Sequence, residues 1–342
     1  MRMGYPALRL LLTIAACTFI FYSSAAQHRH SEAKPLLLQN IHHRVIDGLN
    51  ISGGHEICLH LINCSDITVQ NCRIGPTVKT GIELYNCNNI VIKNCFIYRV
   101  STGIYVINSR GIQVIGNQVL NVQGPFPRGA MVQFDHVTGS GNLVAHNRVE
   151  NRLGESYAED AINMYKSSGT PESPIIIEHN YIRGGGPSPH GGGIMLGDDG
   201  GEYQIARYNV LVNPGQYGMA ISGGTHLSIV HNKIYSKRLP FSNVGLYIWN
   251  QYKVNCAMNT ISDNLVNWTN YKGETNHSYN NGNCGAVSGW DSNIFGAHLS
   301  ENILPQQLIT AKSSKPYKSS PQPRRRRALK HAAAHGRRSR PL

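Results

Sequence analysis

The stretch from Thr80 to Val100 reads T-G-I-E-L-Y-N-C-N-N-I-V-I-K-N-C-F-I-Y-R-V, and its pattern decides the fold. The same pattern returns in residues 102–119 and precedes it in residues 55–74. Each unit ends in a short apolar run that closes on an asparagine. These asparagines are Asn50, Asn71, Asn94, Asn117, Asn147, Asn180, Asn209, Asn232, Asn264 and Asn302. Successive asparagines are at least about 22 residues apart, and several of the spacings are longer. This indicates one repeated structural unit that carries inserted loops.

Each unit contains three short alternating segments rich in Val, Ile and Tyr, separated by Gly, Asn or Ser-Thr breaks. Alternation with period two is typical of strands, and the breaks are typical of turns. A unit of about 22 residues cannot bury its own apolar face, so it must stack on its neighbours. The pattern therefore predicts an all-β fold, a single-stranded parallel β-helix of about ten coils. Its repeated asparagines are expected to form a hydrogen-bonded ladder.

The repeat resembles the right-handed parallel β-helix of the pectate-lyase-like superfamily, where such an asparagine ladder occurs at one turn. The resemblance covers residues 45–303 and implies the architecture, because a fold does not fix the chemistry. Polygalacturonases of this fold carry Asn-Thr-Asp, Asp-Asp, Gly-His-Gly and Arg-Ile-Lys in that order. Here Asp198-Asp199 is present, but His190-Gly191 precedes it and no Arg-Ile-Lys follows. The arginine-centred motif of pectate lyases is absent as well, so neither activity is transferred to this chain.

The two ends of the chain differ from the repeat in composition. Residues 1–26 have a charged start, an apolar run and a small-residue end, which predicts a signal peptide. A lipoprotein cleavage before Cys17 is the alternative. Residues 27–44 are expected to form a polar lead-in and cap, residues 45–306 the β-helix, and residues 307–342 a basic disordered tail. These features predict a secreted or extracytoplasmic protein.

The formal net charge of +13 comes from the ends of the chain. Residues 307–342 hold eleven Lys or Arg and no acid, and the remaining body of the chain is formally neutral. No surface for nucleic acid is therefore predicted on the domain. The tail is a candidate for contact with an anionic surface, and we expect a monomer.

Seven cysteines follow residue 26, and four of them occur as pairs 23 residues apart. Cys64 and Cys87 occupy equivalent positions on adjacent coils, as do Cys72 and Cys95, about 4.8 Å apart. This favours a stack of buried thiols, although disulfides are geometrically allowed. Cys256 and Cys284 are placed so that they could pair across a loop. No C-x-x-C pair is present, so no zinc site is predicted.

The loops lengthen after residue 123, at residues 124–129, 154–160, 168–174 and 184–193. Loops on a rigid scaffold are where function concentrates. Alignment of the strand that begins each coil predicts that Asp135, Lys166 and Asp198 stack on three successive coils, about 5 Å apart. Other ionisable residues flank these strands. They are Arg128, Glu159, Asp160, His190, His136 and Asp199.

This convergence of ionisable groups predicts a site that cleaves or modifies a polysaccharide over coils 4 to 6. The candidate catalytic residues are Asp135, Asp160, Lys166, His190, Asp198 and Asp199, and the candidate substrate-binding residues are Arg128, Tyr165, Tyr247 and Trp249. Two carboxylates suit a glycoside hydrolase. A His, Lys or Tyr base beside a uronate carboxylate would suit a lyase or an epimerase. A Lys between two Asp residues has its charged form favoured, so the better base is His190 and the better acid Asp160 or Asp198.

Alternatives to this interpretation stay open. The charged residues could form an ion-pair ladder in a non-catalytic glycan-binding or surface structural protein. No cofactor is predicted, but Asp160, Asp198, Asp199 and Glu202 carry the oxygen ligands that Ca²⁺ prefers. Residues 245–290 contain all three tryptophans, which suits either sugar stacking or a cap on the end of the core.

Overall fold

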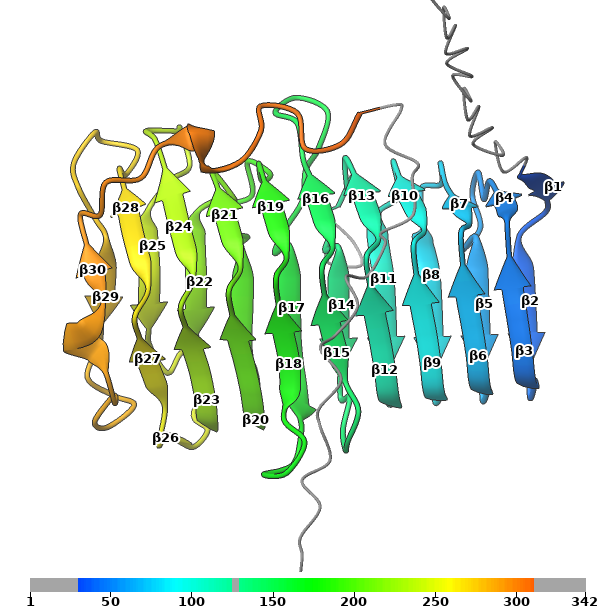
Figure 1. Ribbon diagram of the computed structural model, residues 1–342, viewed down its shortest axis with the longest axis horizontal. Helices are drawn as coiled ribbons and strands as arrows, with labels where there is room; N and C mark the ends of the chain where they lie inside the picture. The colour runs from blue at the N-terminus through cyan, green and yellow to red at the C-terminus, as the bar shows by residue number, and fades with distance from the viewer. Residues whose placement is uncertain (1–29, 125–128, 311–342) are drawn as a thin grey trace, which may run out of the picture.

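Parallel strands run through the residues that the structure describes, which are 30–124 and 129–310. The computed structural model stacks them as successive coils along one axis (Figure 1). All named strand pairs are parallel, and each strand pairs with its equivalents one coil away. This confirms the predicted all-β parallel helix. One sheet has eleven strands, one for each coil, against the ten or so that the repeat predicts.

Three ladders of strands make up the three sides of each coil. The first ladder contains β2 (Leu36–Gln39), β5 (Leu59–Ile62), β8 (Thr80–Tyr85), β11 (Thr102–Ile107), β14 (Val132–Asp135), β17 (Ile162–Ser168), β20 (Ile194–Arg207), β22 (Tyr217–Ile221), β25 (Val244–Ile248) and β29 (Ser278–Asn280). The second contains β3 (His42–Asp47), β6 (Ser65–Gln70), β9 (Asn88–Lys93), β12 (Arg110–Ile115), β15 (Leu143–Ala145), β18 (Ile175–Glu178), the second half of β20, β23 (Gly224–Val230), β26 (Cys256–Ala257) and β27 (Thr260–Ser262). The long strand β20 joins these two ladders into one sheet.

The third ladder forms the eleven-stranded sheet. It contains β1 (Ser31–Ala33), β4 (Leu49–Ile51), β7 (Arg73–Ile74), β10 (Phe96–Tyr98), β13 (Gln118–Leu120), β16 (Arg148–Glu150), β19 (Tyr181–Arg183), β21 (Val210–Val212), β24 (Lys233–Ser236), β28 (Leu265–Trp268) and β30 (Ile294–Phe295). Two short 3₁₀ helices, η1 (Trp290–Ser292) and η2 (Glu301–Ile303), lie near the C-terminal end. Within the described residues, no helix is long and apolar enough to cross a membrane.

The core is built from inward columns of aliphatic side chains. Along the first ladder, Ile82, Ile104, Val132, Ile162 and Ile194 are in register and fully buried. Because side chains alternate across a strand, the residue after each of these points outward. The outward column of the first ladder is therefore fixed by the same register. It contains His60, Glu83, Tyr105, Gln133, Asn163, Met195, Ala220, Tyr247 and Tyr279.

The predicted asparagine ladder is present and buried, although its first and last members differ from the predicted ones. It runs through Asn117, Asn147, Asn180, Asn209, Asn232, Asn264 and Asn293. Each side-chain amide donates to the next amide oxygen at 2.8–3.1 Å. In the coil that precedes Asn117, the ladder position is occupied by Cys95, whose backbone N–H donates to the Asn117 side-chain oxygen at 2.9 Å. Asn71 and Asn94 instead sit one residue earlier in left-handed turns, and Asn302 lies in η2.

Both ends of the described chain extend the helix beyond its expected limits. Strands β1 to β3 lie in residues 31–47 and form the first coil, so residues 31–44 of the predicted polar lead-in are part of the helix. At the other end, the chain returns across the third ladder after β30 (Figure 1). Leu304 and Leu308 pack against Val212, and the Ile309 N–H donates to a Glu150 carboxylate oxygen at 2.6 Å. Residues 307–310 therefore belong to the domain. The predicted signal peptide and the basic tail beyond residue 310 lie outside the described residues.

The cysteines follow the expected division. Cys256 and Cys284 form a disulfide. Among the described residues, Cys58, Cys64, Cys72, Cys87 and Cys95 are free and buried, as the stack of thiols predicts.

The asparagine ladder makes a testable contribution to stability. In Asn180→Ala, the Asn147 side chain loses its acceptor and the Val144 carbonyl loses its donor inside the core. We expect a loss of about 1–3 kcal/mol in the free energy of unfolding, measured by urea denaturation. The control is Asn88→Ala, an exposed position on β9. Equal losses for the two variants would contradict a structural role for the ladder.

Candidate active site

A groove of about 650 Å³ lies over the outward face of the first ladder, from the loop before β17 to β29. It contains five of the ten residues predicted to be catalytic or substrate-binding, namely Asp160, His190, Asp198, Tyr247 and Trp249. The rest of its lining is Glu159, Pro189, Met195, Gln216, Asn243, Val244, Gln251, Tyr252, Asn276 and Tyr279. The lining thus combines carboxylates with aromatic side chains from β25 onward.

Two carboxylates from adjacent coils are held together by one amide. The Asn163 side-chain nitrogen donates to Asp160 Oδ2 at 2.7 Å and to Asp198 Oδ2 at 2.9 Å. The Asn163 oxygen in turn accepts from the Gln133 amide at 2.9 Å, which fixes which end of the Asn163 side chain faces the acids. The two acidic oxygens are therefore separated by no more than two hydrogen-bond lengths.

A bulge in β20 aims Asp198 at this point. Asn163 pairs with Met195, yet Tyr165 pairs with Asp198, so β20 carries one extra residue. Gly197 occupies the bulge with φ +61, and a Cβ there would lie 2.0 Å from the Gly223 carbonyl oxygen. Only glycine fits that position. Such a bulge re-aims the following side chain, which is why bulges occur beside functional sites.

Asp160 is buried among groups that shape its proton affinity. Its Oδ1 accepts from the Tyr217 hydroxyl and from the Gly192 N–H, the latter at 3.0 Å. The pKa of Asp160 is raised to about 6: burial is the main cause, the hydrogen bonds from Tyr217 and Asn163 lower the pKa, and the neighbouring Asp198 raises it. Gly192 has to be glycine, because a Cβ would lie 2.6 Å from the Tyr217 ring.

Aromatic side chains form the other wall of the groove. Tyr252 donates its hydroxyl to Asp198 Oδ1 at 2.8 Å. Trp249 and Tyr279 are each nearly half exposed, so their ring faces are accessible. Tyr247 is buried and packs edge-on against Tyr217. His190 is exposed on the loop that borders Asp160.

The predicted stack of Asp135, Lys166 and Asp198 is wrong. In the observed register Tyr165, not Lys166, pairs with both Asp135 and Asp198. The alignment fails because the β14 row begins at Met131 rather than at Ala130, and because of the bulge in β20.

Four of the other five predicted residues, Asp135, Tyr165, Lys166 and Asp199, lie outside the groove. Asp135 contacts His136 Nδ1 at 2.6 Å and accepts from the Tyr105 hydroxyl at 2.8 Å. Lys166 forms an ion pair with Asp199 at 2.9 Å, and the Tyr165 hydroxyl donates to Asp199 at 3.2 Å. The hydrogen bond to Asp199 raises the pKa of Lys166, which favours its charged form and counts against a role as a base.

Two further expectations concern cations. Arg128, the expected partner of a substrate carboxylate, lies outside the described residues. Within residues 30–124 and 129–310, no group of three or more His, Cys, Asp or Glu side chains is arranged to hold a metal ion. Asp199 and Asp198 point into different clusters, so the four carboxylates suggested for Ca²⁺ do not converge.

Several residues of the site were missed from the sequence. Asn163, Gln133 and Tyr217 hold the acids, and Tyr252 contacts Asp198. Asn163 in β17 and Gln133 in β14 are polar residues between apolar neighbours in their strands, and this pattern in the sequence could have indicated them. Tyr217 and Tyr252 come from later coils, and only the coil stacking brings them to the acids.

The environment of Asp160 predicts the effect of removing one hydroxyl. Tyr217→Phe deletes a hydrogen bond that favours the charged form, so we expect the pKa of Asp160 to rise further above its ordinary range. Carboxyl carbon NMR of aspartate-labelled protein measures this pKa. Tyr208→Phe, at an exposed turn, is the control. An unchanged or lower pKa in Tyr217→Phe would contradict the arrangement.

Comparisons with known proteins bear on the fold. Residues 36–207, half of the chain, match the family described as "Right handed beta helix region". No curated protein sequence matches the chain. Among solved structures, a catalytic-domain variant of a GH87 alpha-1,3-glucanase in complex with tetrasaccharides has 12% identity and a TM-score of 0.46, covering 78% of this chain and 61% of that one. A tailspike protein mutant of E. coli bacteriophage HK620 in complex with pentasaccharide has 16% identity and a TM-score of 0.44, covering 79% and 50%.

The chain therefore spans about 61% of the glucanase domain and half of the tailspike protein. These two likenesses concern the fold alone. The family match extends over coils that the structure shows as a continuous parallel helix with a buried asparagine ladder. The chain belongs to the right-handed β-helix family.

Proposed function

We propose that this protein is a glycoside hydrolase that acts on an uncharged polysaccharide. The observation that carries the proposal is the pair of Asp160 and Asp198 in the groove, bridged by Asn163. Glycosidic bonds are cleaved by two carboxyl groups, one protonated and one ionised. A bridged pair on adjacent coils supplies both within reach of one bond.

The two acids receive different roles from their surroundings. Asp160 has its pKa raised to about 6, so it retains a proton at mildly acidic pH and can protonate the leaving oxygen. Asp198 accepts hydrogen bonds from Asn163 and Tyr252, which hold its carboxyl group beside Asp160. Asp198 then acts on water as a base or on the sugar as a nucleophile. In either route water adds to the sugar carbon and the leaving sugar takes the proton from Asp160.

The charges of the groove favour an uncharged substrate. Its described lining holds three acidic residues, Glu159, Asp160 and Asp198, and no Lys or Arg. A chain of uronates would bring like charges together, which costs affinity. Lyase and epimerase chemistry also requires a cation to absorb the charge on the uronate carboxylate. The lining therefore supports hydrolysis over the other two predicted chemistries.

The aromatic wall supports a sugar ligand. Trp249, Tyr252 and Tyr279 present partly exposed ring faces beside the acids. Aromatic faces combine apolar contact with a polar edge, which suits the mixed surface of a sugar ring. Secretion through residues 1–26, attachment through the basic tail and a monomeric state belong to this proposal as predictions.

A non-catalytic glycan-binding protein is the second candidate. Asp160 is 9% exposed and Asp198 4% exposed, so both acids have limited access to the groove. In that reading the acids and Asn163 only stabilise the loops that shape a binding surface.

Substitution of the acids separates the two candidates. We expect Asp160→Asn and Asp198→Asn to lower kcat on neutral polysaccharides by about 10²–10⁴-fold, because each removes one proton-transfer or nucleophilic group. Reducing-end release on a panel of glucans, mannans, galactans and xylans measures this, and circular dichroism checks folding. Asp263→Asn is the matched control, an exposed aspartate at a left-handed turn that asparagine tolerates. Glycan binding without hydrolysis by the wild-type protein would favour the binding module.

The rate should also depend on pH through Asp160. This group acts as an acid only when protonated, so hydrolysis is expected to fall as pH rises through about 6. The measurement is kcat/KM against pH, with far-ultraviolet circular dichroism at each pH to exclude unfolding. A rate that rises through this range would contradict the assignment of Asp160 as the acid.

A further inference from the structure

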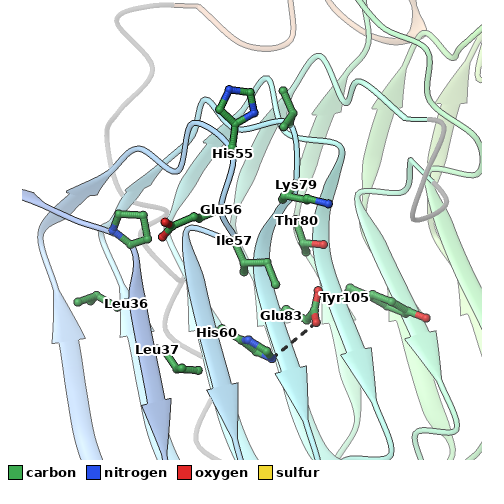
Figure 2. Close-up of a pocket in the computed structure, with 12 residues that line it drawn as sticks. Leu36, Leu37, His55, Glu56, Ile57, His60, Lys79, Thr80, Glu83 and Tyr105 are labelled. Atoms are coloured by element: carbon green, nitrogen blue, oxygen red, sulfur yellow. Dashed lines mark ion pairs between the residues drawn. The ribbon is translucent and has the colours of Figure 1, made fainter.

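A second pocket of about 610 Å³ lies near the N-terminal end of the same face (Figure 2). We call it the N-terminal pocket. Its lining residues are Pro35, Leu36, Leu37, His55, Glu56, Ile57, His60, Val78, Lys79, Thr80, Glu83 and Tyr105. None of these residues belongs to the groove described above, and the proposed hydrolysis does not use them.

The N-terminal pocket combines an ion pair with exposed apolar side chains. His60 and Glu83 face each other at 3.6 Å (Figure 2), and both side chains are mostly shielded from solvent. Leu37 and Val78 are nearly 60% exposed. Two carboxylates, two histidines and Lys79 nearly balance in charge, so the pocket has no strong preference for an ionic ligand. A neutral sugar fits these residues, because its hydroxyl groups can bond to Glu83 and His60 and its C–H faces can contact Leu37 and Val78.

The strand register connects this pocket to the groove. His60, Glu83, Tyr105, Gln133 and Asn163 are successive members of the outward column of the first ladder. Three coil steps separate Glu83 from Asn163, which is about 14 Å at the usual strand spacing. The bridge between the two acids therefore lies within a short oligosaccharide's length of the N-terminal pocket, along the helix axis.

The residues between the two pockets are polar. The Tyr105 hydroxyl donates to Asp135, which also contacts His136. Gln133 continues this polar column and donates its side-chain amide to Asn163 at 2.9 Å.

We infer that the N-terminal pocket is a distal binding subsite for the same uncharged polysaccharide, which lies along the helix axis from His60 and Glu83 to the groove at Asp160 and Asp198. The inference rests on the proposed function for the nature of the ligand. It adds the direction of the bound chain and a preference for long substrates.

The test compares short and long ligands in full-length protein that carries Asp160→Asn, which prevents cleavage. Trimers and decamers of neutral glucan, mannan, galactan and xylan are titrated by calorimetry. We expect one decamer to bind at least about tenfold more tightly than its trimer, and Glu83→Gln to remove about tenfold of the decamer affinity, as loss of hydrogen bonds to a charged group implies. Trimer affinity should not change.

Two further variants keep the test clear. Glu178→Gln is the matched control, since Glu178 pairs with Arg207 on the second ladder at 2.8 Å. His60→Gln probes the same pocket if Glu83→Gln fails to fold, as judged by its melting temperature.

The outcomes separate this inference from the proposed function. Equal affinities for trimer and decamer, or a decamer affinity that Glu83→Gln and His60→Gln leave unchanged, would overturn the inference, even if Asp160-dependent hydrolysis is found. Decamer binding that depends on Glu83, without hydrolysis of any polysaccharide by the wild-type protein, would overturn the proposed function and support the inference. No binding to any series overturns both.

Discussion

Parallel hydrogen bonding between successive coils is the constraint on which the rest of the structure depends. It repeats the chain at about 4.8 Å and places one residue of each coil above its equivalent in the next. Each side chain therefore stacks on the side chains at the equivalent positions of the neighbouring coils, and together they form a column. In the core this gives aliphatic stacks and the buried asparagine ladder, in which Asn180, for example, accepts from Asn147 of the coil before and donates to Asn209 of the next coil.

The same constraint makes a carboxylate pair difficult to build. Two acids on adjacent coils repel each other, and burial adds to the cost. Hydrogen bonds donated to the two carboxylates offset this cost. Asn163 gives one hydrogen to each acid, Gln133 fixes Asn163, and Tyr217 and Tyr252 each serve one acid. A pair supported in this way keeps one member near its protonation point, which acid–base chemistry requires.

The fold was predictable because its signal is periodic. Recurring apolar runs and polar turns fix the strands, the coil spacing and the outward columns without knowledge of any contact. Asp160, His190 and Asp198 were predicted to converge because ionisable residues on long loops stand out against such a background, and all three line one groove. Lys166 was misplaced because the β14 row was aligned one residue too early and because β20 carries a bulge, and neither irregularity leaves a periodic trace in the sequence.

Other parts of the site depend on contacts between residues that lie far apart along the chain, and the repeat does not encode these contacts. Tyr217, the first residue of β22, and Tyr252, which follows β25, lie one and two coils beyond Asp198, and the stacking of the coils brings them to the acids. Asn71 and Asn94 look like members of the ladder in sequence. The backbone places them one residue away in left-handed turns, a conformation that asparagine tolerates well. Cysteine at the ladder position satisfies the same backbone geometry and hides the correct alignment.

The most direct test of the central claim is to run the reaction on neutral polysaccharides in water labelled with heavy oxygen, and to weigh the fragments. Hydrolysis by Asp160 and Asp198 predicts that each new reducing end carries one labelled oxygen, and that the label disappears with the Asp160→Asn variant. Unlabelled, unsaturated fragments, obtained from uronate polysaccharides rather than from neutral ones, would contradict the account.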